Sequence, residues 1–258
     1  MIPYHDENET QRTAIVTMAI IAACTLAWVV LQGAGSYAPL ASSVCNLGLI
    51  PGEITGRIPP GTAVQMGPGP EGTELMCVTE PGRQLVTLLT HMFLHGSWMH
   101  LIGNMWFLWL FGNNIEDSMS RPRFVIFYLL CGLAAAGLQI ALDPRSGLPM
   151  VGASGAISGV MGAYLILYPR VRVFALLVIG FFVTSIALPA WTMLLYWAAI
   201  QFVSGLFGLL ASDRGRVAFW AHVGGFVAGV VLIKVFARSD YVVAHRRHHW
   251  EPRRLVGR

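Results

Sequence analysis

A serine and a histidine stand out in this chain because each lies in a stretch that is otherwise apolar. Ser154 lies in the string Gly-Ala-Ser-Gly, and His222 lies in the string Ala-His-Val-Gly-Gly. A hydroxyl and an imidazole within hydrogen-bonding distance form the nucleophile and the base of a hydrolase. We therefore expect hydrolytic chemistry inside a membrane if the fold brings these two side chains together.

The composition is that of an integral membrane protein. Of the 258 residues, 55% are hydrophobic and 12% are charged, whereas soluble domains carry about 25% charged residues. The arginines near the C-terminus indicate a tail that faces anionic lipid rather than a patch that binds nucleic acid. The lipid bilayer is therefore the expected partner, and no nucleic-acid partner is expected.

Six apolar runs are long enough to cross about 30 Å of hydrocarbon. They cover residues 13–31, 88–111, 124–142, 154–168, 190–210 and 219–237. A seventh apolar stretch, 171–188, would place the basic tail outside if it were a full span, against the positive-inside rule. We therefore expect an interfacial or re-entrant segment there, with six spans and both termini in the cytoplasm.

The spans divide one predicted membrane domain, residues 1–258, into four parts. Residues 1–12 form a cytoplasmic N-terminus, 32–84 a long extracytoplasmic loop, 88–237 the catalytic core spans, and 238–258 a basic cytoplasmic tail. The first span could instead be a signal peptide, but its apolar core exceeds the usual 7–15 residues, so we expect it to be retained. The location is predicted to be a bacterial plasma membrane.

The cysteines fall into two groups. Cys24 and Cys131 lie in apolar runs and are expected to be inert. Cys45 and Cys77 share the long loop 32–84. If that loop is extracytoplasmic, a disulfide between them is plausible, and the sequence leaves open whether it forms.

The predicted topology brings Ser154 and His222 to the same side of the membrane, because both of their spans begin there. The span 154–168 is only about 22 Å long, so its start should lie below the outer surface beside a polar cavity. A hydrogen bond between the two side chains requires closely packed backbones, which small residues four positions apart permit. Such pairs are Gly155 with Gly159 and Gly225 with Gly229.

Polar side chains in the second span could assist the same chemistry. His100 and Asn104 stand one helical turn apart and can donate hydrogen bonds to a common point, as an oxyanion in acyl transfer requires. We group Gly152 with them as a residue of the oxyanion and substrate site. No acidic residue in the spans is placed to orient His222, so a dyad is predicted.

A metal site is the competing interpretation of the second span, because His91 and His95 also lie one turn apart. There is no His-Glu-x-x-His sequence, and no carboxylate lies within the span. We therefore expect no metal, and we expect His91 and His95 to brace the outer loop by hydrogen bonds.

Together these motifs resemble the rhomboid family of intramembrane serine proteases. The resemblance covers roughly residues 88–234. It consists of the strings around Ser154 and His222, the downstream Gly225 and Gly229, the spacing of His95, His100 and Asn104, and a Gly-x-x-x-Glu pattern that ends at Glu116. Two features depart from the family. Ser158 occupies a position that is often aromatic, and the first outer loop is longer and lacks an obvious Trp-Arg pair.

The resemblance implies an all-α polytopic fold with a bundle of six transmembrane helices. It implies cofactor-free cleavage of transmembrane protein substrates, with Ser154 as nucleophile and His222 as general base. His100 and Asn104 would help to form the oxyanion hole, and His95, Gly225, Gly229 and Glu116 would support the site.

Two other functions stay open at this point. One is a catalytically silent rhomboid-like protein that binds transmembrane clients. The other is a transporter, which is disfavoured because no charged residue lies in the middle of a span to couple an ion. The physiological substrate, the cleavage position, the organism and the oligomeric state do not follow from the sequence.

Overall fold

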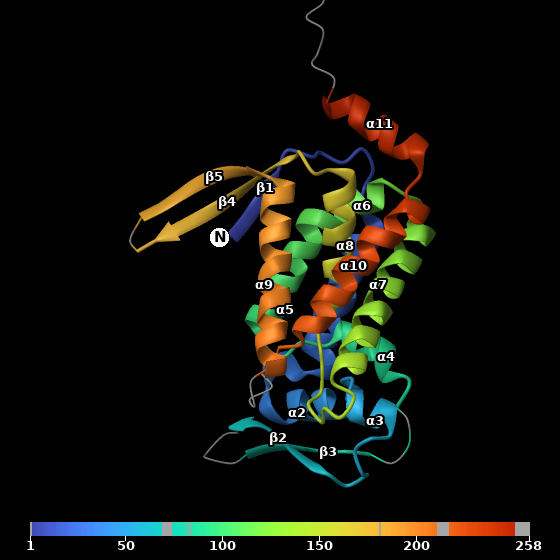
Figure 1. The fold of residues 1–258 in the computed structure, drawn as a ribbon, viewed down its shortest axis with the longest axis vertical. Coiled ribbons are helices and arrows are strands. Elements are labelled where there is room, and N and C mark those ends of the chain that lie inside the picture. The colour runs from blue at the N-terminus through green and yellow to red at the C-terminus, as the bar shows by residue number, and fades with distance from the viewer. Residues whose placement is uncertain are drawn as a thin grey trace, which may run out of the picture.

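The computed structural model describes residues 2–68, 74–80, 82, 84–180, 182–210 and 217–250. Within these residues the chain is mostly helical, and its longer helices run along the long axis of the molecule (Figure 1). These are α1 (Ile15–Leu26), α7 (Arg121–Leu142), α8 (Ser154–Leu167), α9 (Ala190–Leu210) and α10 (Phe219–Phe236). Residues 211–216, between the predicted spans 190–210 and 219–237, and the end of the predicted tail, 251–258, lie outside the described residues.

Among the described residues, α7, α9 and α10 are long and apolar enough to cross a membrane. Two shorter apolar helices accompany them, namely α8 and the segment Ile15–Leu31, in which α1 continues into the π-helical turn η1 (Ala27–Leu31). The chain is therefore a membrane protein. Because three helices reach spanning length, the count of six spans stays a prediction.

The predicted span 88–111 is not one unbroken helix. It contains α4 (Thr87–Thr90), the short 3-10 turn η4 (His91–Phe93), α5 (Trp98–Phe107) and the π-helical turn η5 (Leu108–Gly112), and α6 (Asn113–Asp117) follows. A new helix begins after Ser97, whose Oγ accepts a hydrogen bond from the backbone N–H of His100 at 3.1 Å. This side-chain cap satisfies one of the free N–H groups at the start of α5.

The expectation of an all-α fold is wrong in part, because the chain also contains strands. The stretch predicted to be interfacial or re-entrant, 171–188, holds the antiparallel hairpin of β4 (Arg172–Ile179) and β5 (Phe182–Pro189). β1 (Ile2–Asp6) pairs with β4, so the order is β1-β4-β5. The β-branched and aromatic residues of this stretch favour extended backbone. The hairpin projects sideways from the helices (Figure 1).

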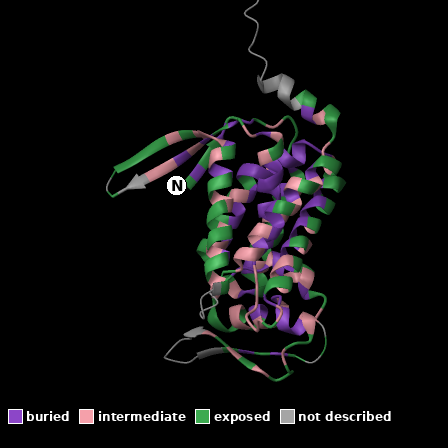
Figure 2. Cartoon of the chain, viewed as in Figure 1, coloured by how far each residue is buried: buried purple, intermediate pink, exposed green. Residues whose placement is uncertain are grey.

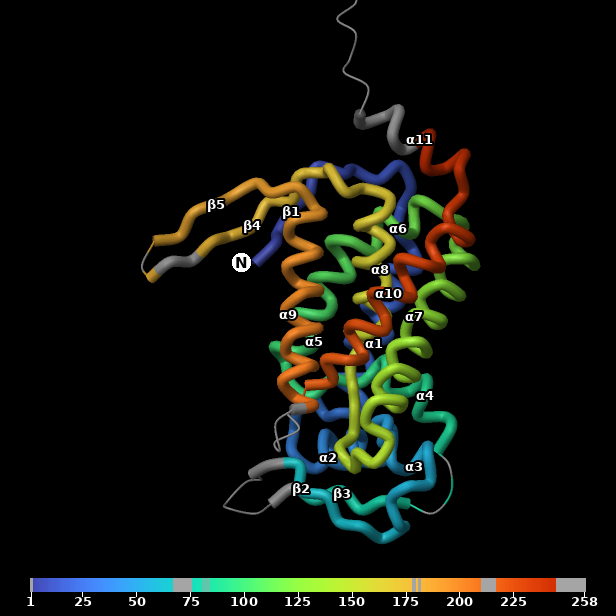
Figure 3. Tube along the Cα trace, in the orientation of Figure 1, coloured from blue at the N-terminus to red at the C-terminus, as the bar shows by residue number. Residues whose placement is uncertain are grey.

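The long loop 32–84 is more regular than the sequence predicts. It contains the 3-10 turn η2 (Gly33–Gly35), α2 (Tyr37–Leu47), α3 (Pro51–Thr55) and a hairpin of β2 (Ala63–Pro68) with β3 (Glu74–Val78). A disulfide joins Cys45 of α2 to Cys77 of β3. These elements cover one end of the bundle, whereas β1 and α11 (Ser239–Trp250) lie at the other end (Figures 1 and 3).

The most buried helix of the bundle is α8. Every residue from Gly155 to Tyr164 is buried, and the buried residues gather along the middle of the molecule (Figure 2). α7 and α10 pack against α8, and the outer side of α9 carries exposed apolar side chains such as Tyr196 and Phe207. Helix α8 therefore forms the fixed centre against which the candidate site is built.

Candidate active site

Ser154 and His222 meet at the beginnings of two helices. Ser154 is the first residue of α8, and His222 lies in the first turn of α10. His222 Nε2 lies 2.8 Å from Ser154 Oγ. This distance is within the range of a hydrogen bond between a nucleophile and its base, so the fold brings together the two residues that the sequence selected.

Glycines allow the backbones of α8 and α10 to come close enough for this contact. A Cβ added at Gly225 would collide with the carbonyl oxygen of Gly155, and one added at Gly229 would collide with that of Gly159. The pairs of small residues that the sequence contains thus face one another across the interface. Close approach of this kind is what small residues four positions apart permit between membrane helices.

The other ring nitrogen of His222 has a partner that sequence reasoning missed. His222 Nδ1 lies 2.7 Å from Oε1 of Gln201 on α9. No carboxylate in the spans is placed to orient His222, but an amide oxygen is also a hydrogen-bond acceptor. The available signal was a glutamine in the middle of the apolar run 190–210, where polar side chains usually have a function.

An aromatic ring also lies beside His222, although it does not come from the family position at Ser158. The rings of Trp197 and His222 have centroids 5.8 Å apart and an interplanar angle of 42°. Ser158 instead donates a hydrogen bond from Oγ to the carbonyl oxygen of Ser154 at 2.6 Å. Ser158 thus bonds to the backbone of its own helix, as a serine in an apolar helix commonly does.

His100 is held in one orientation beside Ser154. Its Nδ1 accepts a hydrogen bond from the backbone N–H of Gly96 at 3.3 Å, so in the neutral ring Nε2 carries the proton and can donate. A Cβ added at Gly152 would lie 2.9 Å from His100 Nε2 and 3.5 Å from Ser154 Oγ. The absent side chain of Gly152 therefore makes room for the donating nitrogen of His100 next to the Ser154 hydroxyl.

Asn104 lies one turn after His100 on α5 and is buried. Its Nδ2 donates to the carbonyl oxygen of His100 at 2.9 Å. An amide nitrogen carries two protons, so a second donor remains for a ligand. His100, Asn104 and Ser154 line one cavity of about 590 Å³.

Polar residues of α9 and α10 and apolar residues of the long loop 32–84 also line this cavity. Gln201 and His222 line it, together with Leu40 and Val44 of α2 and Met66 of β2. The last three residues come from α2 and β2, which lie together at one end of the bundle (Figure 1). The candidate nucleophile, the candidate base and two hydrogen-bond donors thus line a common space.

His95 and His91 lie behind this site and fix its walls. His95 is fully buried, its ring meets that of His100 edge-on at 5.2 Å, and its backbone N–H and carbonyl oxygen both bind the amide of Gln32, at 2.8 and 2.7 Å. The carbonyl oxygen of His91 accepts from the N–H of Gly152 at 2.9 Å. Among the described residues, no group of three His, Cys, Asp or Glu side chains could hold a metal ion.

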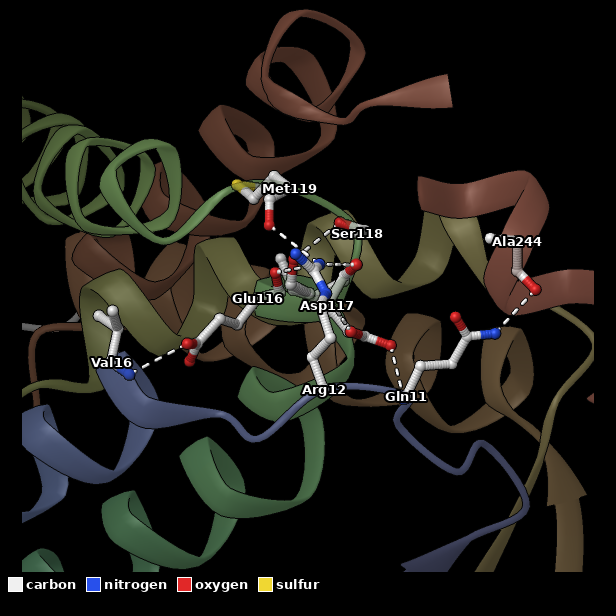
Figure 4. A network of polar contacts seen from close by, with 9 residues as sticks. Gln11, Arg12, Val16, Glu116, Asp117, Ser118, Met119 and Ala244 are labelled. Carbon is white, nitrogen blue, oxygen red and sulfur yellow. Dashed lines mark hydrogen bonds and ion pairs between the residues drawn. The ribbon is translucent and has the colours of Figure 1, made fainter. Parts of the chain in front are cut away.

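Glu116 supports the bundle at the end opposite the cavity. Its carboxylate accepts hydrogen bonds from the backbone N–H of Val16 at 3.0 Å and of Thr17 at 2.8 Å, and from the Thr17 hydroxyl at 2.9 Å. Beside it, Arg12 binds the buried carboxylate of Asp117 at 2.9 Å (Figure 4). The carboxylate of Glu116 thus caps α1, because it satisfies N–H groups that have no partner within the helix.

A comparison with known families and proteins agrees with this geometry. Residues 82–239, more than half of the chain, match the Rhomboid domain. The chain is 27% identical over 155 residues to Rhomboid-like protein 11, chloroplastic, from Arabidopsis thaliana, which covers 58% of this chain and 52% of that protein. It is also 27% identical over 150 residues to Rhomboid protein 1, mitochondrial, from Saccharomyces cerevisiae, covering 57% and 40%.

A third relative is the Presenilin-associated rhomboid-like protein, mitochondrial, from Mus musculus, at 28% identity over 148 residues, with 52% of this chain and 39% of that protein covered. The matched region spans about half or less of the length of these relatives. Because the domain match covers more than half of the chain, the chain belongs to the rhomboid family.

Proposed function

We propose that this chain is an intramembrane serine endopeptidase that cleaves transmembrane segments of membrane proteins with a Ser154–His222 dyad. The observation that carries the proposal is the 2.8 Å contact between His222 Nε2 and Ser154 Oγ at the wall of a cavity of about 590 Å³. A histidine and a serine in this contact are the groups that nucleophilic acyl transfer requires.

In the proposed mechanism Ser154 Oγ attacks the carbonyl carbon of the scissile peptide bond, and His222 Nε2 takes the hydroxyl proton. The negative charge that develops on the carbonyl oxygen is stabilised by donors from His100 Nε2 and Asn104 Nδ2. His222 then returns the proton to the leaving amine. A water molecule hydrolyses the acyl-enzyme, with His222 again as base.

The substrate must offer an accessible carbonyl group to this cavity. An intact transmembrane helix hides its carbonyl oxygens in hydrogen bonds within the helix. We therefore propose that the preferred segments contain helix-breaking Gly or Pro residues near the end of the bundle that holds α2. A bacterial plasma membrane with both termini in the cytoplasm is the proposed location, and it rests on the distribution of basic residues.

The test uses the full chain in proteoliposomes with a reporter transmembrane segment that contains Gly and Pro. We expect the wild type to cleave it and to react with a serine-directed fluorophosphonate, and we expect Ser154→Ala and His222→Ala to do neither. Ser185→Ala on β5 is the matched control, because its hydroxyl binds Tyr4 rather than the dyad. Cleavage at the wild-type rate by Ser154→Ala would disprove the mechanism. A folded wild type that does not react with the fluorophosphonate would instead favour a protein that only binds transmembrane clients.

A further inference from the structure

We propose that Gln201 is a positioning residue that holds His222 in the tautomer needed by Ser154. The inference rests on the proposed function of the dyad. It begins from the two contacts of one ring, namely Nδ1 to Gln201 Oε1 at 2.7 Å and Nε2 to Ser154 Oγ at 2.8 Å. The imidazole is therefore held between a residue of α9 and a residue of α8 by its two opposite nitrogens.

The chemistry of the two partners fixes the position of the ring proton. A carbonyl oxygen of an amide can only accept a hydrogen bond, so the proton in the contact with Gln201 Oε1 lies on Nδ1. In a neutral imidazole the lone pair then lies on Nε2. That lone pair is aimed at the Ser154 hydroxyl, which is the arrangement in which His222 can remove the hydroxyl proton.

The amide performs here the task that a carboxylate performs in a Ser-His-Asp triad, where the third residue selects the tautomer and orientation of the histidine. α9 is an apolar helix of spanning length, and a carboxylate inside such a helix is costly. A neutral amide supplies the same accepting oxygen without a buried charge. When His222 becomes protonated, its Nδ1–H keeps the same acceptor.

A second residue of α9 also helps to orient His222. Trp197 lies one helical turn before Gln201, and its ring faces the ring of His222 at a centroid distance of 5.8 Å. The position on α8 that could supply an aromatic residue is Ser158, whose hydroxyl binds the carbonyl oxygen of Ser154. Helix α9 therefore orients His222 from two positions, by a hydrogen bond and by ring contact.

The first test compares the kinetics of three variants of the full chain in proteoliposomes. Gln201→Met keeps the length of the side chain and removes the accepting oxygen, so we expect kcat to fall about 10- to 100-fold with KM nearly unchanged. Gln201→Glu restores an accepting oxygen and should recover most of kcat. Ser204→Ala, which removes a polar group elsewhere on α9, should behave as the wild type. Equal kcat in Gln201→Met and the wild type would overturn the proposal.

The second test reads the tautomer directly and does not depend on activity. The protein is labelled with ¹⁵N-histidine, and the His222 signals are assigned by comparison with His222→Gln. We expect ¹⁵N chemical shifts of a protonated Nδ1 and an unprotonated Nε2 in the wild type, and a mixture of tautomers in Gln201→Met. A wild-type ring protonated on Nε2 would overturn the role of Gln201. A wild type that neither cleaves nor reacts with fluorophosphonate contradicts the proposed function. The ¹⁵N shifts of His222 still test whether Gln201 selects its tautomer in that case.

Discussion

The carbonyl oxygen of Gly155 occupies the space that the side chain of residue 225 would need. Since Gly155 follows the candidate nucleophile and Gly225 follows the candidate base by one turn, the same contact that packs α8 against α10 sets the distance between Ser154 and His222. Helix packing and the geometry of the dyad are thus one property of this interface.

We therefore expect Gly225→Ala to separate the two helices and to abolish proteolysis. The added methyl group meets a backbone carbonyl, which cannot move aside as a side chain can. The free energy of unfolding should therefore fall by about 1–3 kcal/mol. Gly137→Ala in α7 is the matched control, because an added Cβ there meets no atom within 4 Å. Thermal unfolding in detergent and reporter cleavage measure both effects. Full cleavage by Gly225→Ala would show that the distance is not set here.

Gly152→Ala should impair catalysis more than stability. Gly152 has a φ of +131°, which L residues rarely adopt, and an added Cβ would lie 2.8 Å from Cε1 of His100. The imidazole must then move away from the space beside Ser154, and loss of one oxyanion donor lowers kcat about 10²- to 10³-fold.

The control for this variant separates backbone strain from the contact with His100. Gly56→Ala also places a side chain at a positive φ, +66°, with no atom within 4 Å, so it tests a positive-φ substitution without disturbing the cavity. We expect it to retain the wild-type kcat. A similar loss of kcat in both variants would mean that strain, and not His100, explains the result.

Glu116→Ala should destabilise the protein without a direct effect on the chemistry. The carboxylate accepts three hydrogen bonds at the start of α1, two of them from backbone N–H groups. Because these donors would be left without their partner, we expect a loss of roughly 2–4 kcal/mol in unfolding free energy. Glu7→Ala is the comparison, since Glu7 forms an exposed ion pair with Arg172 and such pairs contribute about 0–1 kcal/mol. Equal thermal midpoints for the two variants would contradict the capping role.

Asp6, at the end of the molecule that lies away from the cavity, should make the free energy of unfolding depend on pH. Burial raises the pKa of Asp6 to about 6, although the hydroxyl of Tyr164 donates to its carboxylate and His5 lies nearby. A carboxyl group whose folded pKa is raised stabilises the fold at low pH, and this contribution is lost as the pH rises through about 6.

Asp6→Asn removes this titration and leaves His5 and Tyr164 in place. The wild type should therefore lose roughly 2–3 kcal/mol of stability relative to Asp6→Asn between pH 4 and pH 7. Unfolding in detergent at a series of pH values measures the difference. Parallel stability curves for the two proteins would show that Asp6 does not titrate in this range.

Much of the candidate site could be predicted because its chemistry lies in residue types that are rare in apolar segments. Ser154, His222, His100 and Asn104 needed only their identity and spacing to be selected, and the structure places all four around one cavity. The glycine pairs could also be predicted, because a missing side chain permits a close approach whichever helices meet.

The remaining features depend on contacts between distant segments, which no local pattern records. Gln201 became visible as a partner of His222 only when α9 was placed beside α10. The break before α5 depends on Ser97, whose side chain acts as a cap, while the surrounding apolar run favoured one long helix. The sequence predicted only an interfacial or re-entrant segment at 171–188, and the β4–β5 hairpin was missed because periodicity alone does not distinguish the strands of such an apolar run from other buried structure.

The disulfide between Cys45 and Cys77 bears on which side of the membrane each end of the bundle faces. It joins α2 to β3, and these elements lie at the end of the bundle that holds the cavity. Such bonds persist in oxidising compartments and are reduced in the cytosol. The disulfide therefore supports the proposed topology, in which the cavity opens on the extracytoplasmic side, and this support does not depend on any count of basic residues.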